Sequence, residues 1–392
     1  MHRQAAARLF GLWIALILIT GITASAEPII GKGPYLQQVD TTSIIVCWVT
    51  NFEAPSLVEY GATERLGQRT EEVLTDRERR EQVWSAGGER ELIAFHQVPI
   101  TGLQPDTRYY YRVRTGNAAS AVATFRTAVR PGQSFTFVAF GDMRPTPNHR
   151  AVVERALRLS PEPRFILNTG DLLSDGQRWP DWQGFFDWEA PLLAKVPIYP
   201  CLGNHEHDAE NYFALFNLPD NERWYSFTYG DVHCVALDAN GEYRGSAAQR
   251  QWLIQDLNRH WDSPYTFLFF HHPIYSCTND IGRRIGGLDM ADTWQPIFEA
   301  YEVTAVFNGH DHNYQHNLVN GVHHVVTGGG GASIYPVRPR SFTVKTAPIY
   351  HVVQVEIGPA AATFTVIKAD DGKVIETWSV PRRDTTALQY SE

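Results

Sequence analysis

Short apolar segments alternate with helical ones from residue 135 to residue 326, and this alternation constrains the fold more than any other feature. The segments predicted as strands are Phe135–Phe140, Arg164–Leu167, Val196–Tyr199, Val232–Leu237, Thr266–Phe270, Val303–Phe307 and His324–Val326. Strands that alternate with helices form βαβ units, which build a mainly parallel sheet. The clearest helix is Ser246–Trp261, where Ser246 and Gln249 form a predicted capping box ahead of an apolar stripe.

Most of the predicted strands are followed by a polar side chain of a type that binds metal ions. These side chains are Asp142, Asp171, Asn204, His205, His271, His272, His310 and His312. In open α/β folds ligands bind outside the carboxyl ends of the strands, so the sheet should bring these residues to one edge. Carboxylate, amide oxygen and imidazole suit divalent or trivalent ions. A Gly-Asp turn or a buried His-His pair can each be purely structural, but five such strand ends together favour a metal site.

Two glycine positions are expected to shape this edge. Gly203 can adopt a backbone conformation closed to other residues, so we expect a sharp turn there that lets Asn204 and His205 point to different partners. The run 328–331 consists of four glycines after a strand but lacks the Gly-Lys-Ser/Thr ending of a phosphate loop. We therefore interpret this run as tight backbone packing near the site.

Residues 33–127 carry a different pattern, which predicts an all-β domain. Ser43–Thr50 is rich in β-branched residues, and Leu103–Val113 alternates with period two, so that its tyrosines at 109 and 111 share one face. Short strands separated by polar turns are typical of a β-sandwich. The charged stretch Thr70–Arg90 is predicted to be a solvated loop or hairpin.

The overall charge limits the possible partners. The chain has 392 residues, with 34 basic and 43 acidic side chains and a formal net charge of −9. Nucleic acid or an anionic membrane as the main partner would require a basic face. We therefore expect neither nucleic acid nor, beyond export, a membrane as a partner.

The first 26 residues have the features of a signal peptide. Arg3 and Arg8 give a positive segment that precedes the apolar run Leu9–Ile22, and Ala24-Ser25-Ala26 supplies a cleavage motif. We expect a secreted or periplasmic protein whose mature chain begins at Glu27, with an uncleaved membrane anchor as the alternative. No later apolar run is long enough to span a bilayer.

Export would place the four cysteines in an oxidising compartment. Cys47 lies in a strand-like segment and is expected to be a buried free thiol. Cys201 and Cys234 lie on neighbouring predicted strands and are the pair that could form a disulfide, although spacing alone does not choose a pairing.

The motifs GDMR, GDLLSDG, GNHE, FHHP and GHDH together resemble those of the calcineurin-like metallophosphoesterases. The all-β region opens with Gly33-Pro34-Tyr35-Leu36-Gln37 and resembles the N-terminal domain of purple acid phosphatases, while its Leu-x-Pro-x-Thr-x-Tyr-x-Tyr pattern resembles fibronectin type III domains. The resemblance implies two domains, an all-β sandwich and a four-layer α/β domain. The implied boundaries are a signal peptide at 1–26, the fibronectin III-like domain at 27–130, the metallophosphoesterase domain at 131–380 and a tail at 381–392.

Carried over position by position, the resemblance implies a centre of two metal ions, which could be Fe, Mn or Zn. One ion would be held by Asp142, Asp171 and His312. The other would be held by Asp171, Asn204, His271 and His310, so that Asp171 bridges the pair. His205 would be the catalytic residue facing the phosphate, and Arg144, His207 and His272 are expected to bind substrate.

Two positions depart from the family pattern. Ser174 stands where purple acid phosphatases have a tyrosine, whose complex with iron(III) gives the family its colour. Arg144 stands where other metallophosphoesterases have a histidine. One ion therefore lacks a usual ligand, and Arg144 could instead bind phosphate or pair with a carboxylate.

The resemblance implies hydrolysis of small phosphate esters by attack of a metal-bound water, with His205 stabilising charge or protonating the leaving oxygen. An acid phosphatase-like monoesterase is the favoured reading. A phosphodiesterase or nucleotidase on the same site and a non-catalytic surface-binding protein with a decayed site are the alternatives. The segment Ser276–Asp292, with its arginines at 283 and 284, is expected to influence substrate choice. The sequence leaves the oligomeric state open.

Overall fold

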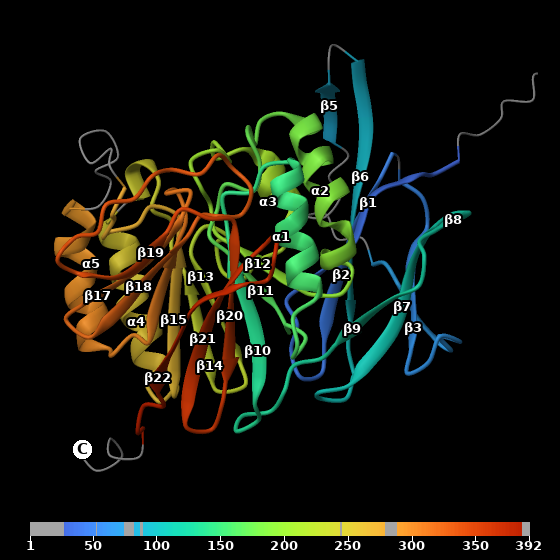
Figure 1. Ribbon diagram of the computed structural model, residues 1–392. Coiled ribbons are helices and arrows are strands. Elements are labelled where there is room, and N and C mark those ends of the chain that lie inside the picture. The colour runs from blue at the N-terminus through green and yellow to red at the C-terminus, as the bar shows by residue number, and fades with distance from the viewer. Residues whose placement is uncertain are drawn as a thin grey trace, which may run out of the picture.

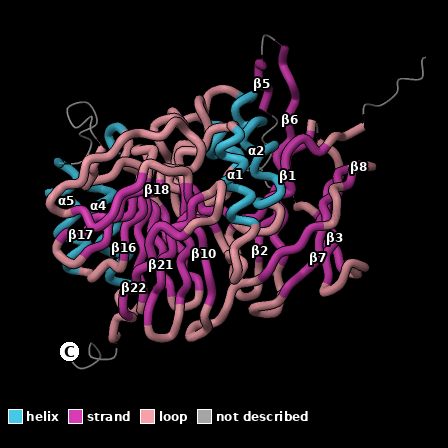
Figure 2. Tube along the Cα trace, in the orientation of Figure 1, coloured by secondary structure: helices cyan, strands magenta, loops and turns pink. Residues whose placement is uncertain are grey.

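The computed structural model describes residues 27–51, 53–73, 82–86, 89–243, 245–278 and 288–385. A β-sandwich formed by the N-terminal part of the chain lies beside a larger α/β domain (Figure 1). Helices lie on the outside of the α/β domain and strands in its middle (Figure 2). The predicted signal peptide, most of the 276–292 segment and the end of the tail lie outside the described residues.

The N-terminal domain consists of two antiparallel sheets. Its strands are β1 Ile30–Gln37, β2 Ile44–Thr50, β3 Ser56–Gly61, β4 Gln68–Glu71, β5 Gln82–Ala86, β6 Glu89–Ile100, β7 Arg108–Thr115, β8 Ala118–Ala119 and β9 Ala123–Arg126. One sheet has the order β1-β2-β6-β5, and the other has β4-β3-β7-β8 with β9 also on β7. The buried Trp48 donates across the sandwich to the Thr115 hydroxyl at 2.8 Å. The predicted sandwich is therefore confirmed. In the stretch predicted as a loop or hairpin, β5 pairs antiparallel with the start of β6, which continues to Ile100.

The sandwich packs on one helix of the α/β domain. The Tyr35 ring of β1 lies 4.9 Å from the Phe186 ring of helix α2 (Trp179–Leu193). The Tyr111 hydroxyl donates to the Ala194 carbonyl just past that helix at 2.9 Å. Both tyrosines are fully buried, so the two domains share a continuous apolar core.

The α/β domain contains two sheets that pack face to face. The first has the order β12-β11-β10-β20-β21-β22, with β10 Phe135–Phe140, β11 Ile166–Asn168, β12 Ile198–Pro200, β20 His351–Ile357, β21 Ala361–Lys368 and β22 Val374–Pro381. The second has the order β13-β14-β15-β16-β18-β17-β19, with β13 Tyr225–Tyr229, β14 Val232–Ala236, β15 Tyr265–Phe270, β16 Ala305–Asn308, β17 Tyr314–Val319, β18 Val322–Thr327 and β19 Thr343–Ala347. Aromatic contacts such as Phe137 with Phe267, 5.3 Å between ring centroids, join the two sheets.

Helices cover both outer faces of this pair of sheets. They are α1 Pro147–Leu157, α2 Trp179–Leu193, α3 Glu210–Leu215, α4 Ala247–Arg259, α5 Leu288–Ala300 and the 3₁₀ turn η1 Gly241–Tyr243. Figure 1 shows α1 and α2 on the side of the first sheet and α4 and α5 on the side of the second. The domain thus has the predicted four layers. No helix among the described residues is both long and apolar enough to cross a membrane.

The seven predicted strands all exist, and wherever two of them are neighbours they pair in parallel. The antiparallel ladders come from strands that were not predicted, namely β13, β17, β19, β20, β21 and β22. The predicted helix at Ser246 also exists, and the Ser246 hydroxyl accepts from the Gln249 amide at 3.3 Å. The capping box itself is wrong, because the Gln249 side chain accepts instead from the Asp238 amide at 2.7 Å.

All four cysteines are buried free thiols. Cys47 is therefore placed as expected, but the pairing considered for Cys201 and Cys234 is wrong. Cys201 follows β12 at the edge of the first sheet, whereas Cys234 lies on β14 in the second. Because the two strands belong to different sheets, they are not the neighbours that the sequence order suggested.

Candidate metal centre

Five strand ends deliver the predicted ligands to one edge of the two sheets. Asp142 follows β10, Asp171 follows β11, Asn204 follows β12, His271 follows β15, and His310 and His312 follow β16. Three of these residues have left-handed backbone conformations, with φ of 56° at Asp142, 54° at Asp171 and 67° at His310. Non-glycine residues rarely adopt this conformation, and such strain gathers at functional sites.

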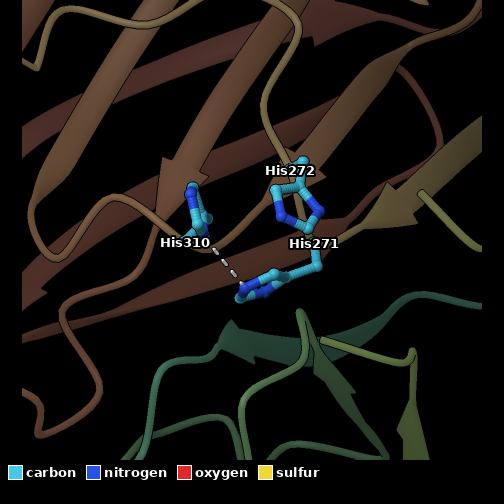
Figure 3. A group of neighbouring side chains, drawn as sticks. All are labelled: His271, His272 and His310. Carbon is cyan, nitrogen blue, oxygen red and sulfur yellow. Dashed lines mark hydrogen bonds between the residues drawn. The ribbon is translucent and has the colours of Figure 1, made fainter. Parts of the chain in front are cut away.

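Asn204, His271 and His310 form the tighter part of the cluster. The Asn204 Oδ1 atom lies 3.0 Å from His271 Nε2 and 3.0 Å from His310 Nδ1. The two ring nitrogens are 3.3 Å apart, as the dashed line in Figure 3 shows. Asp171 Oδ2 lies 3.3 Å from His271 Nε2. Four potential ligand atoms thus converge on one point.

Asp142 and His312 form the second part of the cluster. His312 Nε2 lies 3.3 Å from Asp142 Oδ1. Ligand atoms of Asp142, Asp171 and His271 all lie within 4.8 Å of one another, so the two parts adjoin. The structure therefore brings together all six residues that the sequence predicted as ligands.

The hydrogen bonds behind the imidazoles show which ring nitrogens face the cluster as acceptors. His271 Nδ1 donates to the Thr169 carbonyl at 2.9 Å, and His312 Nδ1 donates to the Ser333 carbonyl at 2.8 Å. A neutral ring that donates through Nδ1 carries a lone pair on Nε2. In both residues this lone pair points at a carboxylate oxygen, and in His271 also at the Asn204 oxygen. Such a group of acceptors requires a positive charge, and a metal ion fits it.

The electrostatics of the cluster lead to the same conclusion. Burial lowers the pKa of His271, but the Asp171 and Asp142 carboxylates outweigh it and raise that pKa to about 10. Burial raises the pKa of Asp171, but His271 and His205 hold it well below its usual range. The carboxylates around His271 thus favour a positive charge at this point, whether the ring carries it as a proton or a metal ion occupies Nε2 instead.

Glu206 supports the bridging aspartate and was not assigned a role from the sequence. Its carboxylate accepts from the backbone amides of Asp171 at 3.0 Å, Leu172 at 2.8 Å and Gly203 at 2.6 Å. It is completely buried, and burial together with Asp171 raises its pKa to about 7. The acidic residue that closes the GNHE motif was the available signal for this role.

Glycine is required at Gly203 for a different reason from the one predicted. Its φ is not in the left-handed region, so the expectation of a conformation closed to other residues is wrong. A Cβ atom there would lie 2.2 Å from Asp171 Oδ1 and 2.4 Å from the Asp171 amide nitrogen. Close approach of the two strand ends therefore excludes a side chain at this position.

The run of glycines at 328–331 packs against the other aspartate. Gly330 donates to the Gly141 carbonyl at 2.9 Å, and Ala332 donates to the Asp142 carbonyl at 3.0 Å. A Cβ atom at Gly330 would lie 2.1 Å from that Gly141 oxygen. The prediction of tight backbone packing is confirmed.

Arg144 and His205 contact each other at the mouth of the cluster. Arg144 Nη2 donates to His205 Nε2 at 2.8 Å, and His205 Nδ1 donates to the Ser174 carbonyl at 2.7 Å. Among the described residues Arg144 thus pairs with an imidazole rather than with a carboxylate. Ser174 contributes its backbone oxygen, which fixes the tautomer of His205.

The two remaining histidines predicted to bind substrate lie beside the cluster. His207 is exposed, with its ring 6.0 Å from that of His205. The His272 ring is 4.3 Å from that of His310, and Figure 3 shows it beside His271. Both residues line a pocket of about 450 Å³ that opens next to Asn204.

Comparisons with known proteins match both parts of the chain. Residues 33–127 match the purple acid phosphatase N-terminal domain, and residues 135–314 match the calcineurin-like phosphoesterase family. The structure resembles that of a purple acid phosphatase from seeds of yellow lupin (Lupinus luteus) with a TM-score of 0.78, at 20% identity over 92% of this chain and 75% of the lupin chain. This likeness is one of fold.

Curated relatives include plant phosphatases. The chain is 25% identical to the phosphoenolpyruvate phosphatase of Allium cepa over 350 residues, covering 80% of this chain and 66% of the relative. It is 31% identical to purple acid phosphatase 15 of Arabidopsis thaliana over 269 residues, covering 56% of this chain and 49% of the relative. The chain thus spans between about half and two thirds of the length of these relatives.

Proposed function

Because this chain joins a purple acid phosphatase N-terminal domain to a calcineurin-like phosphoesterase domain, we propose that it hydrolyses phosphate monoesters at a centre of two metal ions. The observation that carries the proposal is the convergence of imidazole, carboxylate and amide acceptors within hydrogen-bonding distance of one another. The proposal extends to an exported protein with its mature start at Glu27 and domains at 27–130 and 131–380.

The ligands divide into two sets that share Asp171. Asn204, His271 and His310 would complete one set, and Asp142 with His312 would complete the other. When bound, two such ions supply Lewis acidity that polarises a phosphoryl oxygen and lowers the pKa of water to about 7. Iron, manganese and zinc all accept ligands of these types.

Arg144 and His205 are proposed to act on the substrate itself. The planar guanidinium of Arg144 matches the oxygens of a phosphate, so an arriving ester would draw it away from His205. The released Nε2 atom of His205 could then hold a proton and donate it to the leaving oxygen. The Ser174 carbonyl would keep the ring oriented throughout, because it binds Nδ1 in either protonation state.

The test is metal removal followed by reconstitution. Protein stripped with a chelator should lose phosphatase activity on a simple monoester and regain it with iron, manganese or zinc. Two metal ions per chain are expected at full activity. A bis-ester assayed in parallel separates a monoesterase from a diesterase, and a protein that binds the metals without cleaving either ester would contradict the proposal.

A further inference from the structure

The pocket beside the metal centre has a wall built around one arginine. Arg223 forms ion pairs with Asp208 and with the buried Asp238, whose Oδ2 lies 3.4 Å from Nη1. Its guanidinium also lies over two aromatic rings, 5.0 Å from the centroid of Phe213 and 4.5 Å from that of Tyr243. The positive charge of Arg223 is therefore already paired with two carboxylates and stacked against two aromatic rings.

Among the described residues that line the pocket, carboxylates outnumber arginine and lysine. The carboxylates are Asp208, Asp238 and Glu242. Arg223 is the one arginine or lysine among the described lining residues. Glu242 is exposed on the short turn η1 at the rim. An anion that entered this pocket would therefore meet the exposed Glu242, while Arg223, the one arginine or lysine among the described lining residues, is already paired with Asp208 and Asp238.

The remaining lining favours an uncharged ring. Leu202 and the half-buried Tyr243 give the pocket apolar surface, and its volume of about 450 Å³ lies within the range of small-molecule sites. Asn240 is held in place by donating to the Leu202 carbonyl at 2.9 Å. The pocket is thus formed by mutually bonded residues directly beside Asn204 and His272.

We propose that this pocket receives the leaving group of the substrate and selects neutral or cationic ring alcohols over those that carry a second anionic group. The inference rests on the proposed phosphatase function, since it places the phosphate at the metal centre and the alcohol in the pocket. It names a substrate class, namely monoesters whose alcohol is uncharged or positively charged.

The test compares three phenyl phosphates that differ mainly in one charge. The probes carry an ethyl, a 2-aminoethyl or a 2-carboxyethyl group opposite the phosphate, so that their leaving groups have similar acidity and size. For the metal-loaded protein, kcat/KM for the cationic ester should equal or exceed that for the neutral ester, and kcat/KM for the anionic ester should be about fivefold to tenfold lower than for the neutral one. This difference should shrink in high salt, because exposed charges are screened.

Variants identify the residue responsible. Glu242→Gln should raise kcat/KM for the carboxylated ester about fivefold and leave the neutral ester within about twofold. Asp208→Asn should act in the same direction, because it frees part of Arg223. Glu356→Gln is the matched control, since Glu356 is an exposed acid on β20 beside Thr136, at the start of β10 and away from the metal centre.

The outcomes separate this inference from the proposed function. Equal kcat/KM for all three esters, or a preference for the anionic one, would overturn the inference and leave the phosphatase proposal standing. Failure of the metal-loaded protein to cleave any of the three would overturn both. A gain on the carboxylated ester in Glu356→Gln equal to that in Glu242→Gln would show that net charge, and not the pocket, decides.

Discussion

His271 and His324 are both completely buried, yet their surroundings shift their pKa values in opposite directions. At the metal centre, carboxylates raise the pKa of His271 to about 10. On β18, burial and the neighbouring His323 lower the pKa of His324 to about 3. The fold therefore contains one region built to hold positive charge and another built to exclude it, and burial alone does not distinguish them.

The hydrogen bonds of the two regions explain the difference. His271 Nε2 faces Asp171 Oδ2 and Asn204 Oδ1, so oxygen acceptors surround this nitrogen and favour a proton or a metal ion between them. His324 Nε2 lies 3.0 Å from the Gln295 side-chain oxygen, and its ring contacts Tyr275 and Phe298. Among the described residues, only Nε2 of His324 has a hydrogen-bond partner, since its buried Nδ1 atom has none, and no carboxylate faces the ring to favour a charge.

The largest expected effect is on kcat, and it distinguishes the proposed metal ligand Asn204 from the proposed proton donor His205. His205→Ala should lower kcat by about 10²- to 10⁴-fold while both metals stay, because the lost function is proton transfer. Asn204→Ala should lose activity together with one metal. Metal content per chain and kcat, measured with a good and a poor leaving group, check this. Equal metal loss in both variants would make His205 a ligand.

Metal removal should destabilise the charged region. With ions at about 100 times their Kd, each bound ion should contribute about 3 kcal/mol to the free energy of unfolding, or about 5 kcal/mol for the two together. Denaturant unfolding with and without chelator measures this difference. It should shrink in Asp171→Asn, which weakens both ligand sets, and persist in the control His324→Asn. A chelator that left the wild-type protein unchanged would show that the acceptors are satisfied without metal.

The neutral surroundings of His324 should make the free energy of unfolding depend on pH. The pKa of His324 is about 3 when folded, against an ordinary value of about 6.5, so between these values only the unfolded chain binds the proton. Stability from this residue is therefore present above pH about 6.5 and is lost as pH falls, by about 2 kcal/mol at pH 5.

The measurement is the pH dependence of unfolding for the metal-free wild type and for His324→Asn. The variant should lose about 2 kcal/mol less than the wild type between pH 7 and pH 5. His351, whose pKa burial lowers to about 4, stays in place and provides an internal reference. Parallel curves for the two proteins would show that His324 accepts a proton within the fold.

The smallest expected effect is spectroscopic. Ser174 cannot form a tyrosinate complex, so the iron(III)-loaded protein should lack a strong visible charge-transfer band, whereas Ser174→Tyr should gain one. A described tyrosine beside a ligand is Tyr335, whose ring stacks on His312 at 4.1 Å. A violet wild-type protein that loses its colour in Tyr335→Phe would show that this tyrosine reaches the metal.

The sequence predicted the strands whose apolar runs are short and bounded by polar motifs, and it missed those of mixed character. β21 alternates buried and half-buried residues, β22 has no fully buried residue, and β20 joins β10 across more than 200 positions of sequence. The ligand set followed from the motifs at strand ends. Glu206 and the pairing of Arg144 with His205 did not, because both depend on backbone groups and side chains brought together from other strand ends.

What the sequence determined by itself was local: the hydrophobic period of each strand, the polar residues at its end and the order of the two domains. These follow from side chains that are neighbours along the chain. The tertiary structure decided which strands share a sheet, and it thereby placed Cys201 and Cys234 in different sheets. It also decided which acceptors face each other at the strand ends. It likewise decided the charge of each buried histidine, because a pKa depends on the groups within a few ångströms, and in His271 these come from four other strand ends.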